Sequence, residues 1–389
     1  MKNKILLCSF SFGYGIGAEG ICTYRLACAL AKSGIELTVI TSNLSKTKPY
    51  LDNINIYKID SWPFKLHKLL SIYNRIFRKN ADPFNAWKKK VAHIKIPNKV
   101  DCIYARSSPF ASIDAAYELA IKNRLPLIVH FSDPIPSPWA DKNSNQYNLL
   151  LNRLKLILDY AYKITFTNHE AMLYQEKLVG NIIRKSFVLN HVAPNPIFLA
   201  KAKHEKVTFL YTGTFYGKRS FDDLLLAIKR YSSFDDNFEF HFVGSGSFSL
   251  YLAIVRYKLG NFCKVYPKTS HLEKYYRDSD VLVATDPKEG DQVFLSTKLV
   301  EYALLDRPIL LISPKNSPGS HLVARFPETS LRVDYDPDAI SSAMLQMSKN
   351  RSYSKTLYQS RFISMTDFLE KEVAKTFIKN VCSSYILLD

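Results

Sequence analysis

Short apolar runs alternate with amphipathic segments along most of the chain. Between the runs, apolar residues recur at helical spacing, as at Ile21, Tyr24, Cys28 and Ala31, and Gly34 follows where a helix end favours positive φ. The runs themselves predict strands at 4–10, 35–41, 102–104, 127–131, 164–167, 207–211, 238–243, 281–284 and 309–312. Strands that alternate with helices indicate βαβ units and a parallel sheet.

The pattern restarts after Asn195-Pro196, which divides the chain into two similar α/β halves. A length of 389 residues suits two domains. We predict an N-terminal domain over 1–198, a C-terminal domain over 199–359, and a helix over about 360–389 that packs back on the N-terminal domain.

Composition indicates a folded protein with an unusual basic segment. Apolar residues make up 47% of the chain, which excludes a disordered protein, and net charge is +18. Half of that excess lies in segment 61–100, where ten basic residues oppose one acid, Asp82, among aromatic and aliphatic side chains. This mixture predicts binding to an anionic membrane surface, with a solvated basic helix over a core stripe as the alternative. No nucleic-acid partner is expected, because no nucleic-acid-binding module accompanies the charge.

Features of targeting indicate a cytoplasmic protein. No uncharged apolar stretch approaches the roughly 20 residues that cross a bilayer. The first apolar run is short and meets a glycine-rich turn instead of a signal-peptide cleavage site. The six cysteines are dispersed, as expected for buried thiols in a reducing compartment. We expect a cytoplasmic protein, peripheral on the inner face of the plasma membrane.

A glycine-rich sequence, Gly13-Tyr14-Gly15-Ile16-Gly17-Ala18-Glu19-Gly20, separates the first predicted strand from the first helix. It satisfies GxGxxG, but a dinucleotide site also needs an acid at the end of the next strand, which here ends Ile40-Thr41-Ser42-Asn43. NAD(P) is therefore not favoured. The loop either brings backbone amides to an anionic ligand at a helix start or is a tight turn without a ligand.

Two motifs in the second half follow predicted strands, at the edge where open α/β sheets bind ligands. The first, Tyr211-Thr212-Gly213-Thr214-Phe215-Tyr216-Gly217-Lys218-Arg219, offers a flexible loop and two cations suited to a diphosphate. The second, Ser296-Thr297-Lys298-Leu299-Val300-Glu301, opens a helix with amides, hydroxyls and a cation, and supplies an acid for a ribose diol. A surface Lys-Arg pair and an acid that suits the helix dipole are the structural alternatives.

Together, these motifs resemble those of family 4 glycosyltransferases. The glycine-rich loop, Thr-Gly-Thr-Phe-x-x-x-Arg, Val-Gly-Ser-Gly and Ser-Thr-Lys-Leu-Val-Glu-Tyr-Ala-x-x-x-Arg-Pro-Ile occur in that family's order and spacing over nearly the whole chain. The resemblance implies the α/β GT-B fold, with two Rossmann-like domains facing each other across a cleft. It implies that the N-terminal domain is on the acceptor side and that the C-terminal domain binds a nucleotide sugar.

The resemblance also implies roles for individual residues. Arg219 and Lys298 match cations that bind the donor diphosphate and act in catalysis, and Gly17 matches the loop that closes over the phosphates. The other positions assigned to donor binding are Gly213, Thr214, Gly244, Ser296, Thr297 and Glu301.

Two positions depart from the family pattern. Thr214 stands where a second basic residue is usual, and Val293 stands where the first acid of a Glu-x7-Glu pair usually touches the donor sugar. Glu289 and Asp291 are the two candidates to replace that acid, so the identity of the sugar stays open.

On the acceptor side, the resemblance points to Asp133, which follows a predicted strand and is assigned to catalysis through a sugar hydroxyl. Plain Asp-Pro turn chemistry is the alternative. His130 is a second polar candidate, although a histidine within a strand is more often packed in the core. Arg106 ends a neighbouring strand.

The resemblance thus implies a retaining hexosyltransferase that moves a sugar from a UDP- or GDP-linked donor to a lipid-linked or oligosaccharide acceptor in polysaccharide, capsule or O-antigen synthesis. No cofactor and no metal are expected, because no DxD-type carboxylate pair is evident and Asp222-Asp223 is interpreted as a helix start. Two alternatives stay open: a nucleotide-sugar epimerase on the same fold, and a non-catalytic nucleotide-sugar-binding homologue.

Overall fold

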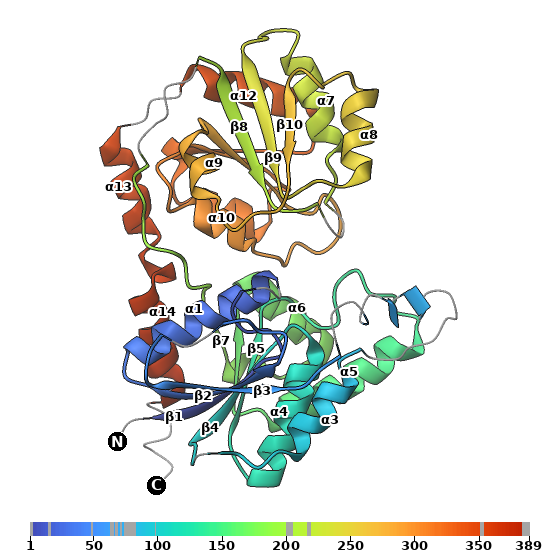
Figure 1. The fold of residues 1–389 in the computed structure, drawn as a ribbon, viewed down its shortest axis with the longest axis vertical. Coiled ribbons are helices and arrows are strands. Elements are labelled where there is room, and N and C mark those ends of the chain that lie inside the picture. The colour runs from blue at the N-terminus through green and yellow to red at the C-terminus, as the bar shows by residue number, and fades with distance from the viewer. Residues whose placement is uncertain are drawn as a thin grey trace. The chain divides into compact units, whose positions relative to one another are not determined.

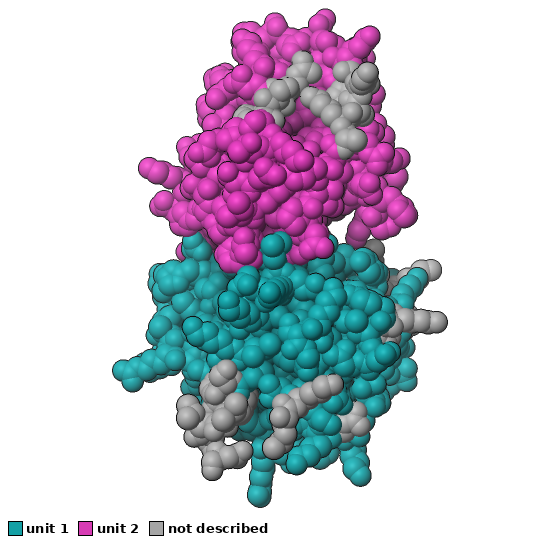
Figure 2. Space-filling view, turned by 90° about the vertical axis from the view of Figure 1, so that its left-hand side faces the viewer, with its two compact units in different colours: residues 1–192, 368–389 teal, residues 193–367 magenta. Residues whose placement is uncertain are grey.

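A computed structural model of the chain describes residues 3–14, 17–47, 50–62, 66, 69–70, 72–73, 83–97, 99–199, 205–215, 219–350 and 354–382. The chain divides into two compact units: unit 1, Met1–Val192 with Phe368–Asp389, and unit 2, Ala193–Asp367 (Figure 2). The boundaries expected from the sequence, after 198 and 359, differ from these by six and eight residues.

Unit 1 contains a parallel sheet that has seven strands within the described residues (Figure 1). In spatial order the strands are β3 (Ile54–Ile59), β2 (Glu36–Ser42), β1 (Lys4–Cys8), β4 (Cys102–Arg106), β5 (Leu127–Phe131), β6 (Lys163–Phe166) and β7 (Ser186–Val188). The chain runs outward from β1 to β3 and then returns to β4 on the other side of β1. A topological switch point therefore lies between β1 and β4, where α/β sheets bind ligands.

The helices of unit 1 that lie in the described residues are α1 (Ala18–Lys32), α3 (Asn85–His93), α4 (Phe110–Asn123), α5 (Asn145–Tyr160), α6 (His169–Val179) and α14 (Glu370–Phe377). Short helical turns cover Ile183–Lys185 and Ile378–Cys382. The predicted end of the first helix is confirmed, because Gly34 adopts φ +91° and donates its N–H to the carbonyl of Ala31 at 3.0 Å.

The C-terminal segment of the chain is part of the core of unit 1. Leu30 of α1 and Phe377 of α14 belong to the same buried cluster as Leu7 of β1. At the surface, the Lys32 ammonium lies 2.8 Å from a Glu370 carboxylate oxygen. Burial of one large apolar side chain stabilises a fold by roughly 1.5–3 kcal/mol, so α14 contributes to the stability of this unit.

Unit 2 contains a second parallel sheet, with six strands within the described residues. Their spatial order is β10 (Cys263–Tyr266), β9 (Phe238–Val243), β8 (Val207–Thr212), β11 (Val281–Thr285), β12 (Ile309–Ile312) and β13 (Ser330–Val333). The described helices are α7 (Asp222–Tyr231), α8 (Phe248–Arg256), α9 (Glu273–Arg277), α10 (Thr297–Tyr302), α11 (Pro318–Val323), α12 (Pro337–Lys349) and α13 (Lys355–Ser364), with turns at Pro327–Thr329 and Thr366–Phe368. Phe209 of β8 packs with Ile228 of α7 and Met344 of α12 in one core cluster.

Every strand that the sequence predicts is present, and the described strands that it misses, β3, β7, β10 and β13, are the edges of the two sheets. The edge strand β3 is buried only at Ile54 and otherwise mixes exposed and half-buried positions, and β13 is half-buried throughout. Central strands such as β5 are buried on both faces and so form continuous apolar runs. Edge strands lack that signal because solvent reaches them.

The basic segment 61–100 is described only in part. Lys65, Lys68, Arg75, Arg78 and Lys79 lie outside the described residues. In α3, Trp87 is fully buried, which agrees with a core-facing side of this helix.

One lysine of α3 is engaged inside unit 1. The Lys88 ammonium lies 2.9 Å from the carboxylate of Asp114 on α4, so its charge is neutralised there. Lys89 and Lys90 are exposed, and Lys90 lies 3.7 Å from Asp60. Across the described ranges, no helix has the length and apolar character needed to span a bilayer.

Candidate functional site

In unit 2 the switch point lies between β8 and β11, so the loops that follow these two strands diverge from a common edge. Gly213 follows β8 at φ +94° and donates its N–H to the carbonyl of Val243 on β9 at 2.8 Å. Gly244 follows β9 at φ +83°, and a Cβ placed there would lie 3.6 Å from the nitrogen of Gly213. The two predicted glycines therefore form adjacent turns at the carboxyl edge, while Thr214 is exposed beside them.

Lys298 lies next to this glycine turn. Its Nζ is 3.6 Å from the centroid of the Tyr211 ring, and a Cβ added to Gly213 would lie 3.6 Å from the same Nζ. Tyr302, one turn further along α10, fixes this arrangement: its hydroxyl accepts the N–H of Thr212 at 3.0 Å. The last residue of β8 is thereby tied to the helix that carries Lys298.

Arg219 lies in the loop between β8 and α7 and reaches the end of the neighbouring strand β11. Its Nε donates to the carbonyl of Thr285, the last residue of β11, at 3.1 Å. Burial and the charge of Arg219 hold the pKa of Lys298 well below its usual value. The structure thus brings together the two cations that the sequence assigned to a diphosphate, although their motifs are about 80 residues apart.

A carboxylate that the sequence analysis did not single out lies beside these cations. Asp286 follows β11 and is 1% exposed. Its Oδ2 accepts hydrogen bonds from the hydroxyls of Ser313 at 2.8 Å and Ser317 at 3.0 Å. Burial raises the pKa of this carboxyl group, while Arg219 and Lys298 lower it. An acid directly after the strand sequence Val-Leu-Val-Ala-Thr was the available sequence signal.

The backbone of α11 passes close to the Asp286 carboxyl group. A Cβ at Gly319 in α11 would lie 2.4 Å from Asp286 Oδ2, so only glycine fits this position without displacement of the carboxylate. Tyr335 donates its hydroxyl to the backbone carbonyl of Asp286. Asp286 is therefore a rigidly held carboxyl group beside the cation site.

The remaining predicted donor-binding residues lie near the start of α10. Ser296 and Thr297 are partly buried, and Ser296 is the N-cap, with no hydrogen bond from its side chain to the described helix amides. Glu301 is the fifth residue of α10, close to the end of its first turn. Glu289 and Asp291 are exposed on the loop before the helix.

In unit 1 the glycine-rich loop joins β1 to α1. Gly13 donates its N–H to the carbonyl of Gly20 at 2.7 Å, and a Cβ at Gly20 would lie 2.5 Å from the carbonyl oxygen of Gly13. Gly17 has φ +94° and open space around its Cβ position. Gly20 is therefore required for packing and Gly17 for backbone conformation, while Gly15 lies outside the described residues.

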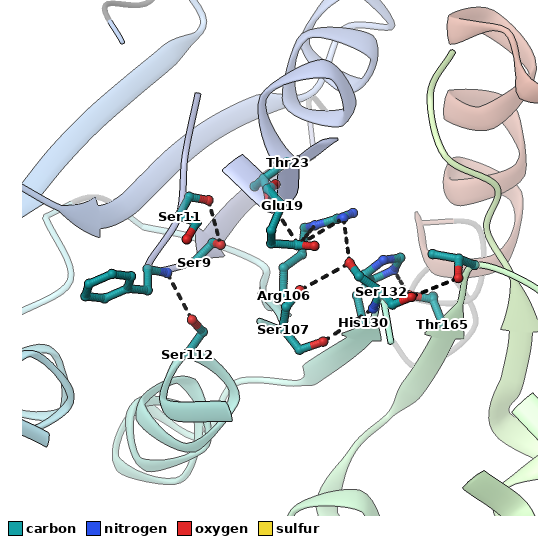
Figure 3. A network of polar contacts seen from close by, with 12 residues as sticks. Ser9, Ser11, Glu19, Thr23, Arg106, Ser107, Ser112, His130, Ser132 and Thr165 are labelled. Atoms are coloured by element: carbon teal, nitrogen blue, oxygen red, sulfur yellow. Dashed lines mark hydrogen bonds and ion pairs between the residues drawn. The ribbon is translucent and has the colours of Figure 1, made fainter. Parts of the chain in front are cut away.

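A polar network lies beneath this loop at the switch point of unit 1 (Figure 3). Arg106, at the end of β4, is 2% exposed and donates from Nε to Glu19 Oε1 at 3.2 Å and from Nη2 to the Ser132 hydroxyl at 3.1 Å. Burial raises the pKa of Glu19 to about 7, although Arg106 lowers it; the nearby charge of Asp133 raises it further. Asp133 itself is exposed at the sheet edge. Sequence reasoning overlooked Glu19, whose signal was an acid in the first turn after a glycine-rich loop.

His130 belongs to the core and is not at the ligand edge. It is 1% exposed, its Nδ1 lies 2.7 Å from the Thr165 hydroxyl, and burial holds its pKa well below the usual value. The alternative interpretation of His130 as a residue packed in the core is confirmed. All six cysteines are buried with free thiols. Among the described residues, no three His, Cys, Asp or Glu side chains are grouped as metal ligands would be.

Comparison with known proteins gives a fold and no close relative. No protein-family model matches the chain, and no curated protein matches it in sequence. Among solved structures, it is similar to sucrose-phosphate synthase from Thermosynechococcus elongatus, at 15% identity over 99% of this chain and 100% of that chain, with a TM-score of 0.70.

Two further solved structures are similar to this chain over nearly its whole length. One is the Anabaena protein HepE in complex with UDP and glucose, at 13% identity over 98% of this chain and 100% of that chain, with a TM-score of 0.69. The other is a Listeria monocytogenes protein assigned as a UDP-N-acetylglucosamine 2-epimerase, at 11% identity over 100% and 98%, with a TM-score of 0.62. With two parallel sheets and alternating helices, the chain has the α/β GT-B fold of two Rossmann-like domains.

Proposed function

We propose that this protein is a glycosyltransferase that uses a nucleotide sugar as donor. The observation that carries the proposal is the position of Lys298 and Arg219 at the switch point of unit 2. Among the described residues, no carboxylate forms an ion pair with Lys298, whose Nζ instead lies over the Tyr211 ring. Lys298 without such a direct ion pair, together with Arg219 at the same sheet edge, suits the diphosphate of a nucleotide sugar.

The reaction follows from that charge. The bond between the anomeric carbon and the phosphate oxygen breaks, a bond to the acceptor oxygen forms, and the departing phosphate oxygen takes the proton of the acceptor hydroxyl. Negative charge that develops on the β-phosphate is stabilised by Arg219 and Lys298, which are held in place before the reaction begins. The proposal assigns this stabilisation to protein cations and requires no divalent metal and no cofactor.

The finer assignments are part of the same proposal. We infer retention of anomeric configuration, transfer of a hexose and a UDP- or GDP-linked donor from the resemblance to family 4 enzymes. HepE was solved with UDP and glucose, which supports a uridine nucleotide as the first ligand to test. Ser296, Thr297 and Glu301 would contact the phosphates and ribose, and Asp133 would orient a sugar hydroxyl.

The acceptor and the location are also proposed. The exposed Lys89 and Lys90 of α3, with the exposed Trp62, Leu69 and Tyr73, support binding to an anionic membrane surface. A lipid-linked saccharide in polysaccharide synthesis fits an enzyme on the cytoplasmic face of a membrane. Neutralisation of Lys89 and Lys90 should weaken binding to anionic liposomes, and unchanged binding would contradict this part of the proposal.

Two measurements test the central proposal. UDP or GDP should raise the unfolding temperature of the protein, because a ligand that binds the native state stabilises it by mass action. Product analysis should then show a new glycoside only when an acceptor is present. Release or isomerisation of the sugar without acceptor would favour a nucleotide-sugar epimerase, which the likeness to the Listeria protein keeps as the second candidate. Nucleotide binding without any turnover would indicate a non-catalytic homologue.

A further inference from the structure

The outer face of α8 in unit 2 exposes large apolar side chains to solvent. They are Phe248, Tyr251, Leu252 and Val255, with exposed fractions of 78%, 48%, 53% and 73%. Positions i, i+3, i+4 and i+7 lie on one side of a helix, so the four side chains form a continuous surface. Single exposed apolar side chains are normal, but a contiguous group indicates contact with another molecule.

The other side of α8 packs in the core of unit 2. Leu250 and Ile254 are buried in one cluster with Phe240 and Phe242 of β9. Figure 1 shows α8 next to α7, and these two helices pack against each other. The helix is therefore apolar on both sides. Because a helix that is apolar all round is normally buried, the outer face of α8 indicates a partner outside this unit.

The size of this face limits what can cover it. An aromatic side chain buries roughly 150–250 Å² in total. The two aromatic side chains here are already partly covered by their own unit. Four side chains of this kind fall short of the roughly 800 Å² that each partner buries in a standard protein interface. A lipid surface needs no complementary shape, so it can accept a patch of this size.

The charges next to this face complement an anionic surface. Segment 240–272, which contains α8, has four Lys and Arg residues and no Asp or Glu. Arg256 is the last residue of α8, one turn after Leu252, and Lys258 follows it. Both basic side chains are exposed, and no carboxylate in the described part of the chain pairs with either. Anionic lipid headgroups would supply the missing negative charge.

We propose that the outer face of α8 inserts its apolar side chains into the surface of an anionic lipid membrane, with Arg256 and Lys258 at the headgroups. Apolar burial and attraction to anionic lipids act together in such binding. Tyr251 suits this depth, because its ring is apolar and its hydroxyl is polar. The inference rests on the membrane location in the proposed function and deepens it, but its observations lie in unit 2 and do not involve segment 61–100.

Vesicle binding by the full chain tests this surface. The probes are vesicles of equal parts phosphatidylcholine and phosphatidylglycerol, with vesicles of phosphatidylcholine alone for comparison, and the measurement is co-sedimentation. Phe248→Ser combined with Val255→Ser should weaken binding to the anionic vesicles about tenfold or more, because two side chains that would leave water are lost. Both positions are exposed, so the variant should stay folded, which thermal unfolding checks.

The matched control is Ile363→Ser. Ile363 is 73% exposed, as Val255 is, but lies on α13 of the same unit. This variant should bind the anionic vesicles as the wild type does.

Two further variants separate attraction from insertion. Arg256→Gln combined with Lys258→Gln should weaken binding to the anionic vesicles about tenfold and reduce its dependence on salt. Phe248→Trp should shift its fluorescence to shorter wavelength when these vesicles are added, because the indole leaves water. The wild type already has three Trp residues, so its spectrum is subtracted. Ile363→Trp should show no such shift.

Three outcomes would overturn the α8 surface: the Phe248 and Val255 double variant binds as the wild type does, Ile363→Ser has an equal effect, or Phe248→Trp shows no shift. A changed oligomeric state of the double variant without lipid, with vesicle binding unchanged, would assign this face to a second copy of the chain instead.

Failure of the proposed function gives a different result. In that case the α8 variants still lose vesicle binding, but nucleotides do not stabilise the protein or no glycoside product forms. If the Lys89 and Lys90 variant binds vesicles normally while the α8 variants do not, the contact through α3 is wrong and the contact through α8 holds.

Discussion

Lys298 Nζ lies 3.6 Å from the centroid of the Tyr211 ring, at the point where β8 ends and the glycine turn begins. The ring face supplies negative electrostatic potential without a formal charge, so it holds the ammonium and leaves it available to an anion. The nearby charge of Arg219 opposes protonation of Lys298, and that of Asp286 favours it. This balance makes the site sensitive to both pH and ligand charge.

Replacement of Lys298 should stabilise the fold and weaken nucleotide binding. Because the pKa of Lys298 is lower in the folded protein than in the unfolded chain, its charge opposes folding, and stability increases as pH rises through that interval. Lys298→Met should therefore raise the unfolding temperature of the ligand-free protein at pH 7. It should weaken UDP or GDP binding by roughly 1.5–3 kcal/mol, the usual range for a hydrogen bond to a charged group.

Calorimetric titration and thermal unfolding measure these two effects. Lys274→Met is the matched control, because Lys274 is also a cation over an aromatic ring, Tyr275, at 4.7 Å, but is exposed on α9. If both variants lose nucleotide affinity equally, the site assignment for Lys298 is wrong.

Arg219→Ala should lower kcat by a factor of roughly 10²–10³, the effect of removing one preorganised group that stabilises transition-state charge. Its Nε bond to Thr285 fixes the guanidinium at the end of β11. Steady-state kinetics with the donor identified by nucleotide screening provides the measurement. Arg230→Ala, which breaks an exposed ion pair with Asp338 on the same unit, should leave the rate unchanged. A wild-type rate for Arg219→Ala would contradict the phosphate role.

Asp286→Asn should change the pH dependence of nucleotide binding. The carboxylate of Asp286 raises the pKa of Lys298, so its neutral replacement lets Lys298 lose its proton at lower pH. The alkaline loss of nucleotide affinity should then occur at lower pH than in the wild type. Asparagine retains an oxygen acceptor for Ser313 and Ser317, which preserves the local fold. An unchanged alkaline limb, measured by titration across pH, would show that Asp286 does not influence Lys298.

Gly20→Ala should destabilise unit 1 by roughly 1–3 kcal/mol, because the new Cβ would lie 2.5 Å from the Gly13 carbonyl oxygen and force the backbone to move. Gly260→Ala in unit 2 meets nothing within 4 Å and should leave stability nearly unchanged. Urea unfolding compares the two variants. Equal midpoints would mean that the glycine-rich loop accommodates a side chain at position 20.

The central strands, the glycine turns and the cationic motifs were predictable from the sequence, because each leaves a local signal. A strand buried on both faces, such as β5, is a continuous apolar run, and Gly34 marks a helix end through a backbone conformation that other residues avoid. Edge strands such as β3 and β13 were missed because solvent on one side leaves mixed polarity.

Only the tertiary structure determines which charged residues, far apart in the sequence, come into contact. Glu19 and Arg106 are 87 residues apart in the chain. They form a hydrogen bond only because β1 and β4 are neighbours in the sheet, which places the ends of these two strands side by side. Burial then sets the protonation of Glu19, Asp286 and Lys298, and burial depends on atoms contributed by many segments. The residue pattern alone determined the fold class and the candidate cations, because periodicity and motif spacing are local. The acidic partners depended on long-range packing, which no local pattern encodes.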